Sequence, residues 1–351
     1  MRLRTVLATV TAGLAAATCL SAAGPADAVA TRTDAPPTAS AHACSPAVSL
    51  DGFSDALDKT TFGGYFVGNL SALAVDRDGS LAALADRSYL FDLDAKTLAP
   101  KKVVGLADEN GAALDSEGLV VDRDGTRLIT SETEPSVRRY SADGRILDRL
   151  PVPSSLLVSP AGRATANQTF EGLTLLDGGR TLLASMEDAI SGDTAGIVRF
   201  QTWQRTRGNH FELSAQYAYR TDDPTLGVPE VQALPDGRLL VLERGFTSGV
   251  GNTVRLFLAD PRHATDTSGV ENLTGQAGVR LIRKTLLTDI ASCPSLGATA
   301  KQPQPNPLLD NIEGMAVTGR AKGAYQVLLV SDDNQNAAQT TRFYRLSVRV
   351  R

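Results

Sequence analysis

The stretch DSEGLVVDRDG, residues 115–125, shows a pattern that the chain repeats. TFEGLTLLDGG at 169–179, VPEVQALPDG at 228–237 and NIEGMAV at 311–317 follow the same scheme, in which one glutamate opens a short apolar segment. In three of the four, that segment runs into an Asp-Gly pair, a strong signal for a β-hairpin. Each stretch is therefore interpreted as the start of a repeated β unit.

Five copies of a longer unit follow from this alignment. They are NLSALAVDRDGSLAALADRS (69–88), SEGLVVDRDGTRLITSE (116–132), FEGLTLLDGGRTLLASMED (170–188), PEVQALPDGRLLVLERG (229–245) and IEGMAVTGRAKGAYQVLLVSDDN (312–334). Most copies are followed by segments that fit a third and a fourth strand, and no long amphipathic helix pattern occurs. Repeats of several hairpin-linked strands predict an all-β fold, a β-propeller with five four-stranded blades.

Three questions about this propeller stay open. The stretch 246–310 is long enough to hold a sixth blade or an insertion, and VSLDGF (48–53) could complete the last blade and close the ring. A β-sandwich or a solenoid is the alternative fold. It is less favoured, because a solenoid needs stricter spacing and a sandwich does not explain the recurring acidic strand ends.

The N-terminal region predicts export. Residues 1–28 combine a basic start, a small-residue apolar stretch and an A-x-A site, which is typical of a signal peptide. A membrane anchor and lipid attachment at Cys19 are weaker alternatives. Residues 29–47, rich in Ala, Pro, Thr and Ser, are expected to form a disordered linker before a propeller domain at 48–351. Cys44 and Cys293 would remain after cleavage; in an oxidising compartment they form a candidate disulfide, the alternative being two unlinked thiols.

Strand pairing within each hairpin predicts where the acidic side chains lie. In an antiparallel hairpin the start of one strand lies beside the end of the next. The expected pairs are Glu117 with Glu132, Glu171 with Glu187, Glu230 with Glu243, and Glu313 with Asp332, while Ser71 faces Asp86 in the first copy. We therefore expect a ring of carboxylates around one mouth of the propeller.

The repulsion between the carboxylates of such a ring must be offset. Two unit charges about 4 Å apart repel by roughly 4 kcal/mol at an effective dielectric constant of about 20. Protonation, pairing with Arg, or a bound hard cation would relieve this repulsion. The cation hypothesis predicts Ca²⁺ held by Glu117, Glu171, Glu230, Glu313 and Asp332, with Asp86, Glu132, Glu187 and Glu243 as supporting residues. SDDNQN (331–336) adds Asp333, Asn334 and Asn336 as further oxygen donors. The alternative is that these acids only fasten blade ends to Arg or backbone N–H groups.

Other chemistries find less support in the sequence. The two DRDG stretches (76–79 and 122–125) resemble calcium loops but fit hairpin turns better, because no twelve-residue loop with a final Glu follows. His210 and His263 lack the spacing of a transition-metal site. No G-x-S-x-G motif occurs, and no basic block points to nucleic acid. An acidic mouth with a metal suits ester hydrolysis, for which Glu171, Glu117, Arg87 and Arg244 are the catalytic candidates.

The repeat segments, with the C-terminal LLVSDDN and RFYRLSV, resemble the phytase-like family, "esterase-like activity of phytase", of secreted bacterial proteins over about residues 65–351. This resemblance implies a β-propeller, an association with calcium, and phosphatase or esterase activity. The sequence departs from the well-described β-propeller phytases: it lacks their long acidic motif and their lysine-rich cleft. That difference argues against phytate, a highly charged anion, as the substrate.

We therefore expect a secreted, monomeric, metal-assisted hydrolase of a small phosphate or carboxylic ester, with no nucleic-acid partner and no membrane span. Two alternatives remain at this point. One is a non-catalytic propeller that serves as a binding module, since a fold does not fix a function. The other is a lactonase-type or sugar-oxidising propeller enzyme.

Overall fold

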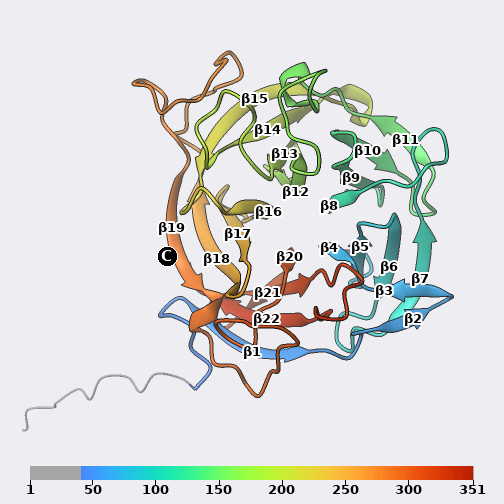
Figure 1. Cartoon of the computed structure of the whole chain (residues 1–351). Helices are drawn as coiled ribbons and strands as arrows, with labels where there is room; N and C mark the ends of the chain where they lie inside the picture. Colours follow the sequence, from blue (N-terminus) through green and yellow to red (C-terminus); the bar gives the residue numbers. More distant parts are fainter. Residues whose placement is uncertain (1–40, 351) are drawn as a thin grey trace, which may run out of the picture. The chain divides into compact units, whose positions relative to one another are not determined.

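The computed structural model describes residues 41–350 and is built almost entirely of strands. Five four-stranded antiparallel sheets form a ring, which confirms a five-bladed β-propeller (Figure 1). Blade 1 holds β4 (Leu70–Val75), β5 (Leu81–Ala85), β6 (Tyr89–Leu93) and β7 (Pro100–Gly105); blade 2 holds β8 (Ser116–Val121), β9 (Arg127–Ser131), β10 (Ser136–Tyr140) and β11 (Ile146–Arg149). Blade 3 holds β12 (Phe170–Leu176), β13 (Thr181–Met186), β14 (Ile197–Arg205) and β15 (Phe211–Arg220); blade 4 holds β16 (Gly227–Ala233), β17 (Leu239–Thr247), β18 (Gly251–Asp260) and β19 (Arg283–Asp289). Blade 5 holds β20 (Ile312–Ala321), β21 (Ala324–Ser331), β22 (Phe343–Val348) and β1 (Val48–Ser54).

The remaining elements are small. A two-stranded hairpin of β2 (Thr60–Phe62) and β3 (Tyr65–Val67) precedes blade 1. Three short 3₁₀ helices, η1 (Ser154–Leu156), η2 (Arg207–Asn209) and η3 (Ile290–Ser292), lie in connections. Residues 246–310 hold the rest of blade 4, η3 and loops, so there is no sixth blade in the described part of the chain. No helix in this part is long and apolar enough to cross a membrane.

The innermost strands β4, β8, β12, β16 and β20 surround the central axis, and each contacts its neighbours, with β20 beside β4 (Figure 1). The glycine that follows Glu117, Glu171 and Glu313 allows this close approach. A Cβ on Gly118 would lie 2.2 Å from the carbonyl oxygen of Glu171, and one on Gly172 would lie 2.6 Å from the backbone nitrogen of Val231. The Glu-Gly pair of the repeat therefore combines a functional side chain with a backbone contact that a larger residue would obstruct.

The apolar residues of each strand pack between neighbouring blades. The largest cluster lies between blades 2, 3 and 4 and includes Phe170 and Trp203, whose ring centroids are 5.8 Å apart. Further clusters join blades 4 and 5, blades 5 and 1, and blades 1 and 2. Burying a large apolar side chain stabilises the fold by roughly 1.5–3 kcal/mol. Because the cores lie between blades, the ring is held together around its whole circumference.

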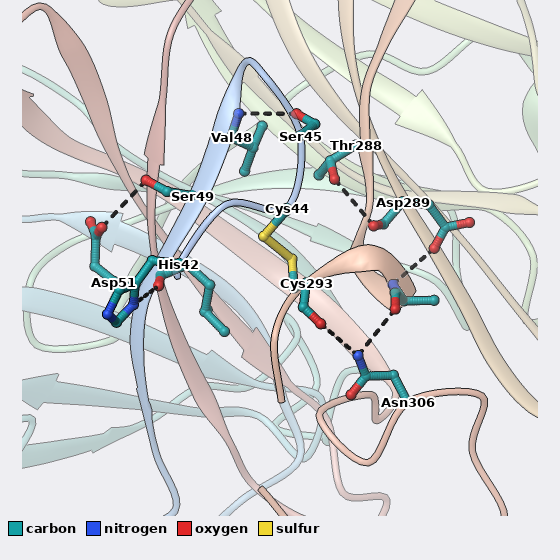
Figure 2. Close-up of a disulfide and its surroundings, with 12 residues drawn as sticks. His42, Cys44, Ser45, Val48, Ser49, Asp51, Thr288, Asp289, Cys293 and Asn306 are labelled. Atoms are coloured by element: carbon teal, nitrogen blue, oxygen red, sulfur yellow. Dashed lines mark hydrogen bonds between the residues drawn. A yellow bond between two sulfur atoms is a disulfide. The ribbon is translucent and has the colours of Figure 1, made fainter. Parts of the chain in front are cut away.

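The ring closes through VSLDGF, one of the possibilities that the sequence left open. β1, which contains VSLDGF, pairs antiparallel with β22 and forms the outer edge of blade 5. Just before β1, Cys44 forms a disulfide with Cys293, which follows η3 (Figure 2). Ala43 also forms an isolated bridge with Ser49. The predicted signal peptide at 1–28 lies outside the described residues, as does the linker as far as residue 40.

Candidate active site

A cavity of about 630 Å³ lies where the inner strands begin, at one mouth of the ring. We call it the acidic cavity. Eight carboxyl groups line it: Asp86, Asp115, Glu117, Glu132, Glu171, Glu187, Glu313 and Asp332. Arg87 and Arg244 are the cations along its wall. The structure thus brings together seven of the nine acids that the hairpin argument grouped, and adds Asp115.

Local backbone geometry aims these acids inward. Glu117, Glu171 and Glu313 each lie at a β-bulge, where the register of the inner strand shifts against its partner. A bulge bends the strand and redirects a side chain. Their partner acids come one residue after the second strand, where a backbone N–H continues the ladder. The backbone N–H of each acid donates to a backbone carbonyl oxygen: Glu132 to Asp115 (2.8 Å), Glu187 to Thr169 (2.6 Å), Asp332 to Asn311 (2.8 Å) and Asp86 to Asn69 (2.9 Å).

Two groups of three carboxyls lie closest together. Asp115, Glu117 and Glu132 form the first, with ligand atoms within 4.8 Å of one another. Glu132, Glu171 and Glu187 form the second, with the same limit. Glu132 belongs to both groups and so links blades 2 and 3 at the mouth.

The inner-strand glutamates of blades 2 and 3, Glu117 and Glu171, have the least compensation of their negative charge by cations or hydrogen bonds. Glu117 and Glu171 are 7% and 5% exposed, and within residues 41–350 neither carboxylate accepts a hydrogen bond or pairs with a cation. Burial raises the pKa of Glu117 well above its usual range, and the neighbouring Glu313 and Glu132 raise it further. The pKa of Glu171 is raised by burial and then by Glu117. Two buried, unpartnered carboxyls facing one cavity are costly without a proton or a cation.

Arg244 offsets the negative charge on the opposite side of the acidic cavity. Its Nη2 donates to Glu313 at 2.8 Å and to Glu187 at 3.3 Å. Burial lowers the pKa of Arg244, but Glu313 and Glu187 outweigh this effect and raise it overall. Burial raises the pKa of Glu313 to about 7 even though Arg244 opposes the shift. Arg87 lies at the rim with a 61% exposed side chain, and its Nε is 3.5 Å from Asp86.

The remaining acids have partial hydrogen bonding. The Thr169 N–H donates to Glu132 at 2.8 Å, yet burial and the nearby Glu187 raise the pKa of Glu132 to about 8. Burial raises the pKa of Asp86 to about 6. Burial also raises the pKa of Asp332, although the Asn334 N–H donates to its carboxylate at 2.8 Å. Glu132, Asp86 and Asp332 therefore hold protons more tightly than free carboxyls do.

Glu230 does not line the acidic cavity, unlike the prediction. In β16 the bulge falls between Gly227 and Glu230, so this glutamate lies beyond it and pairs with Leu242. The corresponding positions in the other inner strands are buried and apolar: Leu73, Leu119, Leu173 and Met315. Glu230 is fully buried, and its Oε1 accepts from the Val231 and Leu173 N–H groups at 2.8 and 3.3 Å, while its buried Oε2 has no hydrogen-bond partner within residues 41–350. It binds backbone groups of two inner strands, below the ring of acids.

Glu243 is also misplaced by the sequence argument. Successive side chains of a strand point to opposite faces, so Glu243 points away from the side that Arg244 faces. Its carboxylate accepts from the Tyr219 hydroxyl at 2.6 Å and from the Asp222 N–H at 2.8 Å. The Lys284 ammonium completes its partners. Glu243 therefore fastens blade 3 to blade 4, which is the role that the alternative interpretation gave to the acids.

Several residues of the acidic cavity were not among the predicted site residues. Asp115 precedes Glu117 by two positions within the opening motif, and that spacing was its available signal. Phe246 and Asn252 come from blade 4, and the other lining residues that were not predicted are the amides Asn167, Gln302, Asn311 and Gln339. Asn334 and Asn336, expected as oxygen donors, also line the cavity. Asp333, considered as an extra oxygen donor, instead pairs with Lys59 and accepts from the Asn69 N–H at 3.0 Å.

The weaker motifs are accounted for by the structure. Both DRDG stretches are hairpin turns, in which Gly79 and Gly125 adopt φ values of 84° and 83°. His210 has an exposed side chain with Nδ1 3.0 Å from Asp148, outside the acidic cavity. The chemistry of the site therefore rests on carboxylates, amides and two arginines.

The chain is similar to several known proteins at low sequence identity. A secreted protein of Arthroderma benhamiae, described as uncharacterized, is 24% identical over 182 residues, which is 39% of this chain and 35% of that protein. The chain thus spans about a third of this relative's length. Among solved structures, the glutaminyl cyclase of Myxococcus xanthus matches with a TM-score of 0.44 and 10% identity, covering 86% of this chain and 97% of that one. The PQQ-bound aldose sugar dehydrogenase of Streptomyces coelicolor matches with a TM-score of 0.40 and 14% identity, covering 86% and 98%.

The family model described as "Phytase-like: Esterase-like activity of phytase" matches residues 66–335. This range includes all five inner strands and every acid of the cavity. The chain belongs to the phytase-like family.

Proposed function

We propose that this protein is a secreted, Ca²⁺-assisted hydrolase of phosphate or carboxylic esters that acts at the acidic cavity. One observation carries the proposal: Glu117 and Glu171 are buried, unpartnered carboxylates that face a shared cavity. Membership of the phytase-like family supports the reaction class.

The donor set fits a hard cation. Calcium is bound by six to eight oxygen ligands in proteins, from carboxylates, carbonyls and water. Glu132 lies within the 4.8 Å limit of Asp115 and Glu117 in one group and of Glu171 in the other, so these four offer carboxylate oxygens around one shared residue. Among the described residues that line the cavity, none offers sulfur or imidazole. These four would hold the ion. A bound Ca²⁺ would supply neutralisation of the negative charge that develops on a reacting ester.

The protein groups divide the remaining tasks. A ring carboxylate outside these four, such as Asp86, whose pKa burial raises to about 6, suits the transfer of a proton from the attacking water. Arg87, exposed at the rim, is placed to bind the anionic group of a substrate by charge-assisted hydrogen bonds. Arg244, held by Glu187 and Glu313, balances the charge of the far wall.

Export is part of the proposal. The N-terminal sequence has the features of a signal peptide, the structure has a disulfide, and the Arthroderma benhamiae relative is described as secreted. Disulfides persist in oxidising compartments outside the cytosol.

Turnover of p-nitrophenyl phosphate and p-nitrophenyl acetate, with Ca²⁺ and then with excess EGTA, tests the function. We expect calcium-dependent hydrolysis that Glu171→Gln lowers by at least about 100-fold, as for the loss of a group acting in the transition state. The matched control is Glu212→Gln, an exposed glutamate outside the cavity, which should retain wild-type rates. Absence of turnover in wild type with added Ca²⁺ would reject hydrolysis of these esters and favour a binding module.

A further inference from the structure

A second cavity lies at the mouth opposite the acidic cavity, where the inner strands end. It has a volume of about 550 Å³, and all five inner strands contribute to its lining. Val75, Val121 and Ala233, the last residues of β4, β8 and β16, are part of its wall. The two cavities share no lining residue within the described part of the chain. We call the second one the apolar pocket.

The apolar pocket differs in chemistry from the acidic cavity. Within residues 41–350 no carboxyl group lines it, and most of its lining side chains are aliphatic, among them Leu119, Leu175 and Val317. The Tyr325 ring, 8% exposed, adds an aromatic surface. Of the valine, leucine and tyrosine side chains in the lining, only Val75 is exposed, at 38%. The apolar surface is therefore recessed, as in pockets that bind small ligands.

The β20–β21 hairpin of blade 5 extends over this pocket. β4 ends at Val75, whereas β20 continues beyond the corresponding Val317 as far as Ala321. The added residues pair with β21, so that Arg320 lies opposite Tyr325. The guanidinium carbon of Arg320 is 5.1 Å from the centroid of the Tyr325 ring, and both residues line the pocket. A cation–π contact thus holds one positive charge at the edge of an apolar surface.

The positive charge of this hairpin has no acid to neutralise it. The turn TGRAKG at 318–323 contains Arg320 and Lys322 but no Asp or Glu, whereas the turns DRDG, DRDG, DGG and PDG of the other blades each contain Asp. Both cations are exposed, and within residues 41–350 neither side chain forms an ion pair. A guanidinium can donate two parallel hydrogen bonds to a carboxylate. The pocket and its edge therefore match a molecule with an apolar chain and an anionic end.

An anionic membrane surface matches this face less well. Membrane binding of this kind relies on clustered Lys and Arg together with apolar side chains that reach into the bilayer. Here the turns of four blades carry Asp, and the apolar side chains lie inside a concave pocket. A single chain that enters the pocket contacts this surface, whereas a flat layer of head groups does not.

We propose that the apolar pocket binds a single-chain amphiphile with an anionic head group, a medium-chain carboxylate. The alkyl chain packs against Leu119, Leu175 and Val317, and the carboxylate accepts hydrogen bonds from the Arg320 guanidinium. Burial of the chain drives binding through the hydrophobic effect, and the charge pair sets the orientation. The inference does not depend on the proposed function, because the apolar pocket lies at the opposite end of the ring from the acidic cavity.

Calorimetric titration of decanoate into the protein in excess EGTA, which keeps calcium out of the acidic cavity, tests this proposal. We expect decanoate to bind, and both butyrate, with its short chain, and decyltrimethylammonium, with its positive charge, to bind at least about tenfold more weakly. Arg320→Gln should weaken decanoate binding by about tenfold. Its matched control is Arg77→Gln, because Arg77 is an exposed arginine in the corresponding turn of blade 1 but does not line the pocket.

A second variant tests the apolar wall. Val75→Asp places a carboxylate on the exposed edge of the pocket and should weaken decanoate binding by at least about tenfold through charge repulsion and lost apolar contact. Val250→Asp is its control, since Val250 is 56% exposed and lies outside the pocket. Thermal unfolding of each variant verifies that the fold is intact.

The outcomes separate this inference from its alternatives and from the proposed function. Absence of decanoate binding to the wild type, equal affinity for decyltrimethylammonium, or unchanged affinity in either folded pocket variant would overturn the inference. Sedimentation with phosphatidylglycerol vesicles in the absence of decanoate binding would assign this face to a membrane instead. Arg320→Gln should hydrolyse p-nitrophenyl esters at the wild-type rate, so failure of the pocket and failure of the proposed function are measured independently.

Discussion

At the scale of single residues, position relative to the bulge decides what a glutamate does. Glu171, at the bulge of β12, faces the acidic cavity without a partner. Glu230, just beyond the bulge of β16, accepts two backbone N–H groups and lies fully buried. Burying a carboxylate is tolerable when hydrogen bonds stabilise it. Identical side chains thus serve as a candidate ligand in one blade and as a structural anchor in another.

This assignment predicts different effects for two substitutions of Glu230. Glu230→Ala should destabilise the protein by about 2–4 kcal/mol, because it leaves a cavity and two unpaired N–H groups. Glu230→Gln keeps an acceptor oxygen and should change the free energy of unfolding by less than about 1 kcal/mol. Chemical denaturation measures both. Loss of calcium binding in a folded Glu230→Gln variant would show instead that Glu230 is a ligand.

At the scale of elements, β1 and the disulfide close the ring. β1 comes from the N-terminal side of the domain and completes blade 5, while Cys44 joins it to the end of η3 (Figure 2). The sequence separation between the two cysteines is 249 residues. Crosslinks that close long loops restrict the unfolded chain strongly. Together, β1 and the disulfide therefore stabilise the closed ring in which the inner strands meet.

Replacing both cysteines should weaken this closure. We expect Cys44→Ser/Cys293→Ser to lose about 2–4 kcal/mol of stability, the typical contribution of a disulfide. Thermal unfolding compared with the oxidised wild type gives the measure, and the mass after alkylation without reductant confirms the bond in wild type. Equal melting temperatures for the two proteins would contradict a stabilising role.

The elements also explain what could be predicted from sequence. Repeats of hairpin signals gave the blades, the closing strand and most of the acid ring, because strand pairing is local and periodic. Blade 4 departs from the strand register that the other repeats share. Glu171 and Glu230 precede their Asp-Gly pairs by the same spacing, but β16 ends at Ala233, before Pro235, which has no N–H for the ladder. That change moves the register, and the extended β17–β18 hairpin with Phe246 and Asn252 has no counterpart among the repeats.

At the scale of the whole molecule, five blades direct their inner strands at one axis and so concentrate negative charge. Burial raises the pKa of Glu132 to about 8, of Glu313 to about 7 and of Asp86 to about 6. A folded state that binds protons more tightly than the unfolded state is most stable at low pH within this range. The acid ring therefore makes stability depend on pH and on cations together.

Without metal, the melting temperature should fall as pH rises. The unfolded carboxyls titrate near pH 4, and the folded ones near 6 to 8, so stability is lost progressively between about pH 5 and pH 8. Differential scanning calorimetry in excess EGTA at several pH values measures this loss. Saturating Ca²⁺ should reduce it, since a ligand of the folded state stabilises by mass action. A melting temperature in EGTA that rises over this range would refute the electrostatic description.

The central claim is that the convergent acids of blades 2 and 3 form a calcium site, and calorimetric titration of Ca²⁺ into EGTA-stripped and desalted protein tests it most directly. Wild type and Glu212→Gln are expected to bind, whereas Glu117→Gln/Glu171→Gln should bind at least about tenfold more weakly, a loss of about 1.4 kcal/mol or more. Failure of the wild type to bind calcium, or equal affinity in the folded double variant, would contradict the account.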